Sequence, residues 1–465
     1  MFKLLINGQM EAGATTAGVV NPATEEVFAE VPIASKAQLD KAVAAAKAAF
    51  PPWSAKSIDE RRAVIRAMAD VLEANAGEIG RLMTQEQGKP LDAGIGEVRR
   101  AAIYFRNVTT MDLPVHIHED SANRRVEQRR RPLGVIGAIV PWNFPIHLMA
   151  TKVPAALLTG NTVVLKPAPT TPLSTLRFCE LVKDIVPPGV LNCIADAGDL
   201  GVEMTCHPDI AKISFTGSTA TGKRVMEVAS KDLKRVTLEL GGNDAAIVLD
   251  DVDPKSVAPK LFNAAFRNTG QICVALKRLY VHDSIYEPIV YELHELAKTA
   301  VVGDGMEQGV QFGPLQNKAQ FERVKELLAD AAKHGTVLSS GVAPTPGYFI
   351  RPTIVRDISD GARLVDEEQF GPVLPVIRYT DPQDALSRAN ASIYGLGGSI
   401  WSSDLERAYA LAERMESGTV WINKHPEMSF DVPFAGAKQS GLGVEMGEEG
   451  LAEFTQIQVI NIARG

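Results

Sequence analysis

The chain has 465 residues and a formal net charge of −8; 45% of its residues are hydrophobic and 22% are charged. This length exceeds what one compact core usually organises, so two or three domains are expected. The negative charge argues against a general affinity for nucleic acid or for an anionic membrane surface.

Cysteines are few and irregularly spaced, and no two of them form a CxxC pair. The sequence therefore predicts neither a disulfide framework nor a zinc site, and no metal is expected. The pair His116 and His118 lacks further ligands at metal spacing and is interpreted as structural. The cysteines are Cys179, Cys193, Cys206 and Cys273.

The N-terminal run MFKLLINGQMEAG has too few consecutive apolar residues for a signal peptide. The most apolar stretch, residues 133–146, is interrupted by glycine and proline well short of the length of a membrane-spanning helix. These features predict a cytoplasmic protein with no membrane partner, in which the cysteines are reduced.

One basic run, RRVEQRRRP at residues 124–132, departs from the overall acidity. Such a run is typical of a solvated strand edge that its charges protect from aggregation. Nucleic-acid binding is the alternative, and only this run favours it, so no nucleic-acid partner is expected.

In the first third of the chain, apolar residues recur at spacings of three and four, which predicts helices over 38–50 and 58–89. From residue 133, short β-rich runs alternate with helical ones, which predicts a parallel sheet with helices on both faces. The expected strands are 134–141, 162–167, 189–195, 210–218 and 235–240, and the helical runs include 147–160 and 173–185.

A second alternating series follows, and the boundary between the two series is expected at the glycines of residues 241–243. The tail, residues 453–463, is a β-like run, and a lone terminal strand of this kind often pairs with the edge of another subunit. The expected strands of the second series are 245–251, 276–283, 336–340, 372–379 and 418–423. The predicted fold class is α/β.

Two motifs follow expected strands, where open α/β sheets bind ligands. In IAKISFTGSTATGK a β-run ends at Gly217 and a helical run follows Gly222, so backbone N–H groups can approach a phosphate. The spacing is not GxGxxG, and an ordinary tight turn remains the alternative. Lys166 follows another strand, where it can contact a ribose or phosphate or simply cap the strand.

Three further residues carry the right chemistry for acyl transfer. Cys273 in NTGQIC is either a nucleophile or a small buried hydrophobe. Asn143 in PWNFP is either an oxyanion donor or a turn asparagine. Glu239 in ELGG is either a general base or a carboxylate that points to water.

Together these motifs resemble the NAD(P)-dependent aldehyde dehydrogenases, of the hydrolytic type that does not acylate CoA. The interval of 34 residues from Glu239 to Cys273 fits this family as well. The motifs that occur in the family's order and spacing are PWNFP, GNTVVLKPA, FTGST, LELGG, GQIC, EEQFGPV and PFAGAKQSGLG.

The resemblance implies a mechanism. Cys273 attacks the aldehyde carbonyl as a thiolate, and the Asn143 amide with a backbone N–H holds the oxyanion. Hydride passes to the nicotinamide, and water deprotonated by Glu239 hydrolyses the thioester. Lys152 and Glu445 match positions that the family uses to carry protons away from the base; structural charges are the alternative.

The resemblance also implies a cofactor site for NAD, with NADP tolerated. Lys166 and the Gly217–Ser218 turn hold the adenosine ribose and pyrophosphate, and Glu368 binds the nicotinamide ribose, with Phe370 beside it. Trp142, Pro169 and Gly241 belong to the same expected site.

The implied fold has two parallel-sheet Rossmann-like domains and a small β oligomerisation element. The implied ranges are 1–112 and 131–242 for the NAD(P)-binding domain, 243–448 for the catalytic domain, and 113–130 and 449–465 for the oligomerisation element. A small-molecule aldehyde is the expected substrate, and a homodimer or homotetramer is the expected assembly.

Two departures from the family pattern concern specificity. Many strictly NAD-dependent members carry a glutamate three residues after the equivalent of Lys166, but here the residue is Pro169, which predicts tolerance of NADP. His147 and Thr151 stand where relatives often place large apolar side chains, which predicts a wider or more polar entrance. A CoA-acylating enzyme and a catalytically inactive binding or structural protein are the rival functions.

Overall fold

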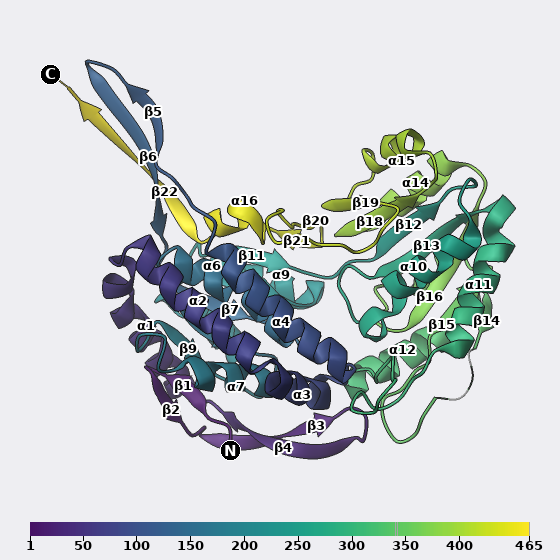
Figure 1. Ribbon diagram of the computed structural model, residues 1–465, viewed down its shortest axis with the longest axis horizontal. Helices are drawn as coiled ribbons and strands as arrows, with labels where there is room; N and C mark the ends of the chain where they lie inside the picture. Colours follow the sequence, from purple (N-terminus) through teal and green to yellow (C-terminus); the bar gives the residue numbers. More distant parts are fainter. Residues whose placement is uncertain (340, 342, 465) are drawn as a thin grey trace.

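The computed structural model describes residues 1–339, 341 and 343–464. Each of two α/β bodies is built around its own sheet, and a narrow antiparallel arm projects from the first body (Figure 1). The expected α/β class with mostly parallel sheets is confirmed. The last residue of the expected strand 336–340 and the last residue of the segment 449–465 lie outside the described residues.

The first sheet has the strand order β2-β1-β9-β8-β7-β10-β11-β21. Its central strands, from β9 to β11, are parallel, and antiparallel strands flank them on both sides. The strands are β1 (Leu4–Ile6), β2 (Gln9–Glu11), β7 (Val135–Ile139), β8 (Thr162–Lys166), β9 (Leu191–Cys193), β10 (Ile210–Thr216), β11 (Arg235–Glu239) and β21 (Gly441–Leu442).

The order of these strands creates a switch point between β7 and β10. The chain runs from β7 outward through β8 to β9, then crosses to β10 and β11 on the other side of β7. Ligands of open α/β sheets bind where the order reverses, beyond the carboxyl ends of the strands. β7 and β8 are buried along their whole length, as parallel strands covered on both faces should be.

Helices cover both faces of the first sheet. The predicted helical run 58–89 is divided at Asn75 into two helices, α2 and α3. One face is covered by α1 (Lys36–Ser54), α8 (Leu200–Cys206) and α9 (Thr219–Ser230), and the other by α5 (Pro145–Ala150), α6 (Val153–Leu158) and α7 (Leu173–Val182), with α2 (Ile58–Ala74), α3 (Ala76–Gln87) and α4 (Leu91–Val108) outside them.

The second sheet has the order β14-β15-β16-β13-β12-β18-β19 and is parallel except at β14. Its strands are β12 (Asp244–Val248), β13 (Leu276–His282), β14 (Thr336–Leu338), β15 (Thr353–Arg356), β16 (Val373–Tyr379), β18 (Gly397–Trp401) and β19 (Thr419–Ile422). One face packs on α10 (Pro254–Phe266) and α11 (Tyr286–Thr299), and the other on α12 (Lys318–Ala331), α13 (Arg363–Asp366), α14 (Pro382–Asn390) and α15 (Leu405–Ala412).

Some elements differ from the sequence-based expectation. The strand expected at 336–340 belongs to the second sheet, but it is antiparallel to β15 because among the described residues no helix separates the two strands, and a parallel pair needs a crossover. The hairpin of β3 (Thr15–Asn21) and β4 (Glu26–Ile33) was not predicted. Nor was the return of the chain from β17 (Tyr394–Gly395) and β20 (Ala437–Lys438) to β21 in the first sheet.

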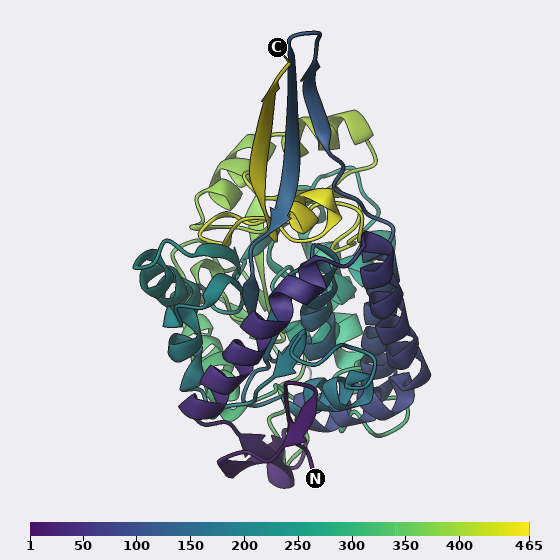
Figure 2. The same ribbon diagram turned by 90° about the vertical axis from the view of Figure 1, so that its left-hand side faces the viewer.

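The arm contains β5 (His116–Asp120), β6 (Arg124–Pro132) and β22 (Thr455–Ala463), and it extends away from both bodies (Figure 2). Its order is β22-β6-β5, so the basic run 124–132 is the middle strand and the interpretation as a strand edge is wrong. The tail pairs with β6 of its own chain over nine residues. It emerges from α16 (Gly447–Ala452).

Three arginines of β6 lie beside acidic neighbours. Arg125 lies 2.5 Å from Asp120, Arg129 lies 2.5 Å from Glu127, and Arg124 pairs with Glu119. The positive charge of the run is therefore partly compensated within the arm. Among the helices that the structure describes, none is both long and apolar enough to cross a bilayer.

Candidate active site

The carboxyl ends of β7, β8, β10 and β11 bring most of the predicted residues to one edge of the first sheet. Lys166 and Glu239 are the last residues of β8 and β11. Gly217 directly follows β10, and Asn143 lies four residues beyond the end of β7. The adjacent parallel pairing of these strands, rather than their distance in sequence, places them together.

Cys273 reaches this edge from the second body on a tightly turned loop. The preceding 3-10 turn η1 (Arg267–Gly270) has left-handed backbone at Asn268, Thr269 and Gly270, with φ of 52°, 57° and 73°. A Cβ on Gly270 would lie 2.3 Å from the Gly371 carbonyl oxygen, so only glycine fits. The conformation is strained for the two residues with side chains, and strain of this kind is often found at functional sites.

Cys273 is partly exposed as a whole residue, and it forms no disulfide. Burial raises its pKa to about 12; Lys277 opposes that rise, and Glu239 adds to it. The thiol is therefore protonated at neutral pH in this state, because only the thiolate carries the charge that burial disfavours. A thiolate at this position needs additional positive charge close to the sulfur.

Asn143 is buried and fixed by bonds to the cysteine loop. Its side-chain amide donates a 3.0 Å hydrogen bond to the Gln271 backbone carbonyl. Its backbone carbonyl accepts from Lys89 at 2.9 Å and from Asn268 at 3.2 Å. An amide nitrogen carries two hydrogens, so one of them remains available to a ligand.

Glu239 is 4% exposed, and within the described part of the chain its Oε1 has no hydrogen-bond partner. Burial raises the pKa of this carboxyl well above its usual range; Glu445 raises it further, and Lys152 lowers it. An unpartnered buried carboxylate is costly, and such a group signals a ligand or a water at the site.

Behind Glu239, Lys152 and Glu445 form a buried ion pair. The Lys152 ammonium also donates to the Thr216 hydroxyl at 2.7 Å. Lys152 begins α6, and Glu445 stands on the C-terminal segment that returns to the first sheet. The structure thus places both predicted residues next to the carboxylate that they were expected to serve.

Lys277, which sequence analysis missed, connects three parts of the site. Its ammonium donates to the Cys273 carbonyl at 2.7 Å, to the Gly242 carbonyl at 2.9 Å and to Glu368 Oε1 at 3.0 Å. Only 2% of its side chain is exposed. The sequence shows a lysine four residues after Cys273, but this spacing does not indicate which groups the lysine binds.

The surroundings of the Lys277 ammonium also include four residues of the expected cofactor site, namely Glu368, Phe370, Trp142 and Gly241. The Trp142 and Phe370 rings meet edge to face with centroids 5.4 Å apart, and the Lys277 ammonium lies 5.4 Å from the Phe370 centroid. A Cβ on Gly241 would lie 2.2 Å from Glu368 Oε2, so glycine is required there for the carboxylate to approach.

Lys166 is buried and paired with Asp196, another residue that sequence analysis missed; Nζ and Oδ1 are 2.7 Å apart. Pro169 is exposed on the loop that follows β8. Gly217 donates its N–H to the Glu239 carbonyl at 3.0 Å, and Ser218 caps α9 by accepting a 3.2 Å bond from the Thr221 N–H.

The predicted entrance residues have different environments. Thr151 is buried, and its hydroxyl donates to the Leu148 carbonyl of its own helix. His147 packs against Phe430 with centroids 6.2 Å apart, and burial lowers its pKa to about 3, so the ring is neutral. The Thr151 hydroxyl is therefore bonded within the protein, whereas the buried Nδ1 of His147 has no hydrogen-bond partner among the described residues.

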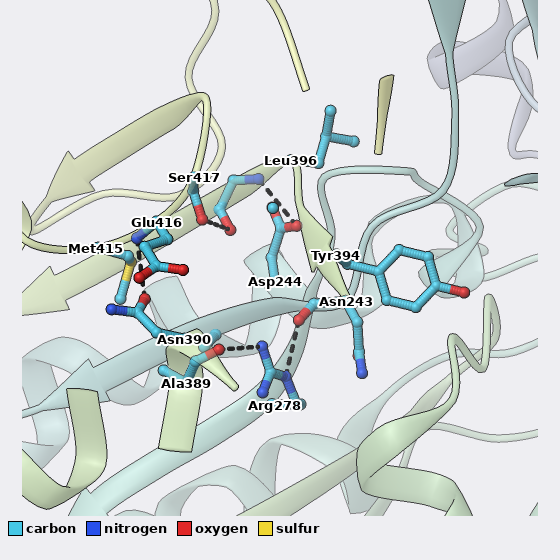
Figure 3. A pocket seen from close by; sticks show the side chains of 13 residues that line it. Asn243, Asp244, Arg278, Ala389, Asn390, Tyr394, Leu396, Met415, Glu416 and Ser417 are labelled. Carbon is cyan, nitrogen blue, oxygen red and sulfur yellow. Dashed lines mark hydrogen bonds between the residues drawn. The ribbon is translucent and has the colours of Figure 1, made fainter. Parts of the chain in front are cut away.

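A small cavity lies beside Asp244 and Arg278 in the second body (Figure 3). The Arg278 guanidinium donates to the Asn243 carbonyl at 2.8 Å and to the Ala389 carbonyl at 3.1 Å. The cavity holds about 10 Å³, which is room for at most about one water molecule. The bonds of Arg278 anchor the start of β12. The cavity is too small for an aldehyde or a dinucleotide. Among the described residues, no cluster of histidine, cysteine and acidic side chains is arranged to hold a metal ion.

Comparisons with known proteins agree with this geometry. Phenylacetaldehyde dehydrogenase of Pseudomonas fluorescens is 38% identical, over 99% of this chain and 96% of its own. Mitochondrial succinate-semialdehyde dehydrogenase of Arabidopsis thaliana is 39% identical, over 96% of this chain and 86% of its own. The solved NAD+ complex of a Bacillus cereus aldehyde dehydrogenase superposes with a TM-score of 0.97 at 36% identity, over 99% of this chain and 96% of its own. A family model described as the aldehyde dehydrogenase family matches residues 9–460, and the chain therefore belongs to that family.

Proposed function

We propose that this enzyme oxidises an aldehyde to the carboxylic acid with NAD+, through a covalent intermediate on Cys273. The observation that carries the proposal is a thiol, a buried amide donor and an unpartnered buried carboxylate at one edge of the sheet. Nucleophile, oxyanion donor and base are the parts that acyl transfer to water requires. The experiment that tests it is NADH formation across aliphatic, aromatic and semialdehyde substrates without CoA.

The residues present fit a dinucleotide. Gly217 and Ser218 lie between β10 and α9, whose N-terminus favours phosphate, and Lys166 ends β8, which is separated from β10 by β7. Gly241 leaves room for Glu368, whose carboxylate accepts hydrogen bonds as a ribose ligand must. Trp142 and Phe370 supply apolar surface beside that ribose. NAD+, when bound, would supply the hydride acceptor and a positively charged nicotinamide ring.

In the first half-reaction Cys273 forms the carbon–sulfur bond and its thiol proton leaves to water. Lys277 favours the thiolate because its ammonium is held at the carbonyl of the same residue. The second N–H of the Asn143 amide and a backbone N–H stabilise the oxyanion of the thiohemiacetal, worth roughly 3–4 kcal/mol where such donors have been measured. Loss of hydride leaves a thioester on Cys273.

In the second half-reaction Glu239 accepts a proton from the water that attacks the thioester. Its raised pKa makes it a stronger base than an exposed carboxylate. Lys152 and Glu445 lie beside it and pass the proton onward. When the carbon–sulfur bond breaks, the carboxylic acid leaves and Cys273 is restored as the thiolate.

Lys277 serves this reaction as a positioning residue. It holds the Cys273 carbonyl, the turn after Glu239 and the Glu368 carboxylate with one ammonium group. The two bodies of the protein contribute different members of this set. A shift of either body would therefore displace Lys277 relative to both Cys273 and Glu368.

We assign residues 1–112 and 131–242 to the cofactor-binding domain, 243–448 to the catalytic domain, and 113–130 with 449–465 to oligomerisation. The arm supports the last assignment, since β22 exposes Ile457 and Val459 to 55% and 56% on one face. Exposed apolar side chains on an edge strand favour a partner strand. A homodimer or homotetramer is proposed, and the cytoplasmic location stays a prediction.

Transfer of the acyl group to CoA is the alternative function. Glu239 favours hydrolysis, because a thiol acceptor does not need a buried carboxylate with an open oxygen atom. Dependence of NADH formation on added CoA would favour the alternative.

A further inference from the structure

Lys166 and Asp196 form a closed ion pair where the proposed function places the adenosine ribose. The side chains are 6% and 0% exposed, and Nζ lies 2.7 Å from Oδ1. The second oxygen, Oδ2, accepts a 2.9 Å bond from the Leu200 N–H. Both oxygens of Asp196 are thus fixed, and Lys166 is a neutralised rather than a free cation.

The Lys166–Asp196 pair lies at the position where dinucleotide folds distinguish NAD+ from NADP+. In dinucleotide folds an acid beyond the strand next to the switch point binds the ribose 2′-OH, whereas a free cation there accommodates a 2′-phosphate. Here that strand is β8, which ends at Lys166, and the carboxylate comes from the segment after β9, its parallel neighbour.

The Asp196 segment packs against the loop that carries Pro169. A Cβ on Gly198 would lie 3.9 Å from Pro169 Cγ, and one on Gly201 would lie 3.8 Å from Lys166 Cε. A negative charge that is absent at position 169 is therefore present on the loop after β9, which contacts the Pro169 loop.

We propose that Asp196 selects NAD+ over NADP+. It cancels the charge of Lys166, so a 2′-phosphate with about two negative charges finds no uncompensated cation at this position. A 2′-hydroxyl keeps its binding, since an ammonium has three donors and the Lys166–Asp196 contact uses one. This inference rests on the proposed function, and it replaces the tolerance of NADP predicted from Pro169 alone.

The test is calorimetric measurement of Kd for NAD+ and for NADP+ on the full-length protein without aldehyde. The wild type should bind NADP+ at least about tenfold more weakly than NAD+. Asp196→Asn should reduce this ratio by about tenfold, because the amide keeps its shape but frees the charge of Lys166. Asp196→Glu should keep the preference. Asp199→Asn is the matched control, because it removes the same charge from an exposed residue of the same loop.

Equal affinities in the wild type, or an unchanged ratio in Asp196→Asn, would overturn the proposal. So would a ratio that Asp199→Asn changes as much as Asp196→Asn does. Loss of both cofactors in Asp196→Asn would show that the pair supports the fold of the site and does not select. A wild type that binds neither cofactor would remove the proposed function itself, which distinguishes that failure from the others.

Discussion

Lys277 lies 3.0 Å from Glu368, and the same ammonium group donates at 2.7 Å to the carbonyl oxygen of Cys273. One buried cation thus joins the proposed nucleophile to the proposed ribose ligand. The charge of Glu368 compensates it, and the Gly242 carbonyl uses its remaining donor. This arrangement explains why a lysine is tolerated in the interior: each of its three N–H groups has an acceptor.

Lys277→Met should slow alkylation of Cys273 by iodoacetamide about tenfold at each pH from 7 to 9 in the absence of cofactor. The reason is that loss of the nearby charge raises the thiol pKa further, and one pKa unit is a factor of ten in thiolate. Lys277→Arg should recover part of the rate. Lys298→Met, at an exposed position of α11, is the control and should react like the wild type. Equal rates in all four proteins would show that Lys277 does not act on the sulfur.

Cys273→Ser should abolish turnover and leave the affinity for NAD+ within about twofold, since the thiolate alone forms the covalent intermediate. Steady-state NADH formation and calorimetry measure the two quantities. Cys206→Ser is the matched control, because Cys206 is exposed and remote from the site. More than a few per cent of residual activity in Cys273→Ser would remove this residue from the mechanism.

Glu239→Gln should spare the first half-reaction more than the second. Rapid mixing with aldehyde and NAD+ should give a burst of about one NADH per active site and then near arrest, because the amide cannot accept a proton from water. If the burst and the steady state decline together, Glu239 acts on the cysteine or on the shape of the site instead.

The same substitution should stabilise the protein at high pH. The folded state raises the pKa of Glu239 above its ordinary 4.5, so between 4.5 and the folded pKa the native state binds a proton that the unfolded state has released. The stability of the wild type therefore falls as pH rises through this window, and the variant lacks this loss. Chemical denaturation at pH 5 and pH 8 should show a gain for Glu239→Gln of about 1–3 kcal/mol at pH 8 and a smaller one at pH 5. A gain that does not change with pH would assign the effect to packing.

Val459→Asp should reduce the assembly to a smaller species by placing a charge on the apolar face of β22. Light scattering coupled to size exclusion measures the mass. Gln458→Asp is the matched control, since neighbouring residues of a strand point to opposite faces and this one faces Arg131 at 3.4 Å. An unchanged mass in Val459→Asp would show that this face of β22 does not hold the assembly together.

The sequence by itself determined the local elements and the chemical inventory of this protein. Alternation of β-rich and helical runs predicted the two parallel sheets, because strands buried on both faces consist of continuous apolar runs such as VIGAI and TVVLK. The family motifs named Cys273, Glu239 and Asn143 as the reacting groups, and the structure places all three at one edge.

Only the tertiary structure decided which charges meet. Asp196 is 30 residues from Lys166, and Glu368 is 91 residues from Lys277, yet each pair is in direct contact. It also decided that the basic run of β6 is the middle strand of the arm, because β22 arrives from the far end of the chain to cover it. Pairing of this kind depends on strand order and loop path, which periodicity does not encode, whereas the preference of a residue for strand or helix depends on its near neighbours alone.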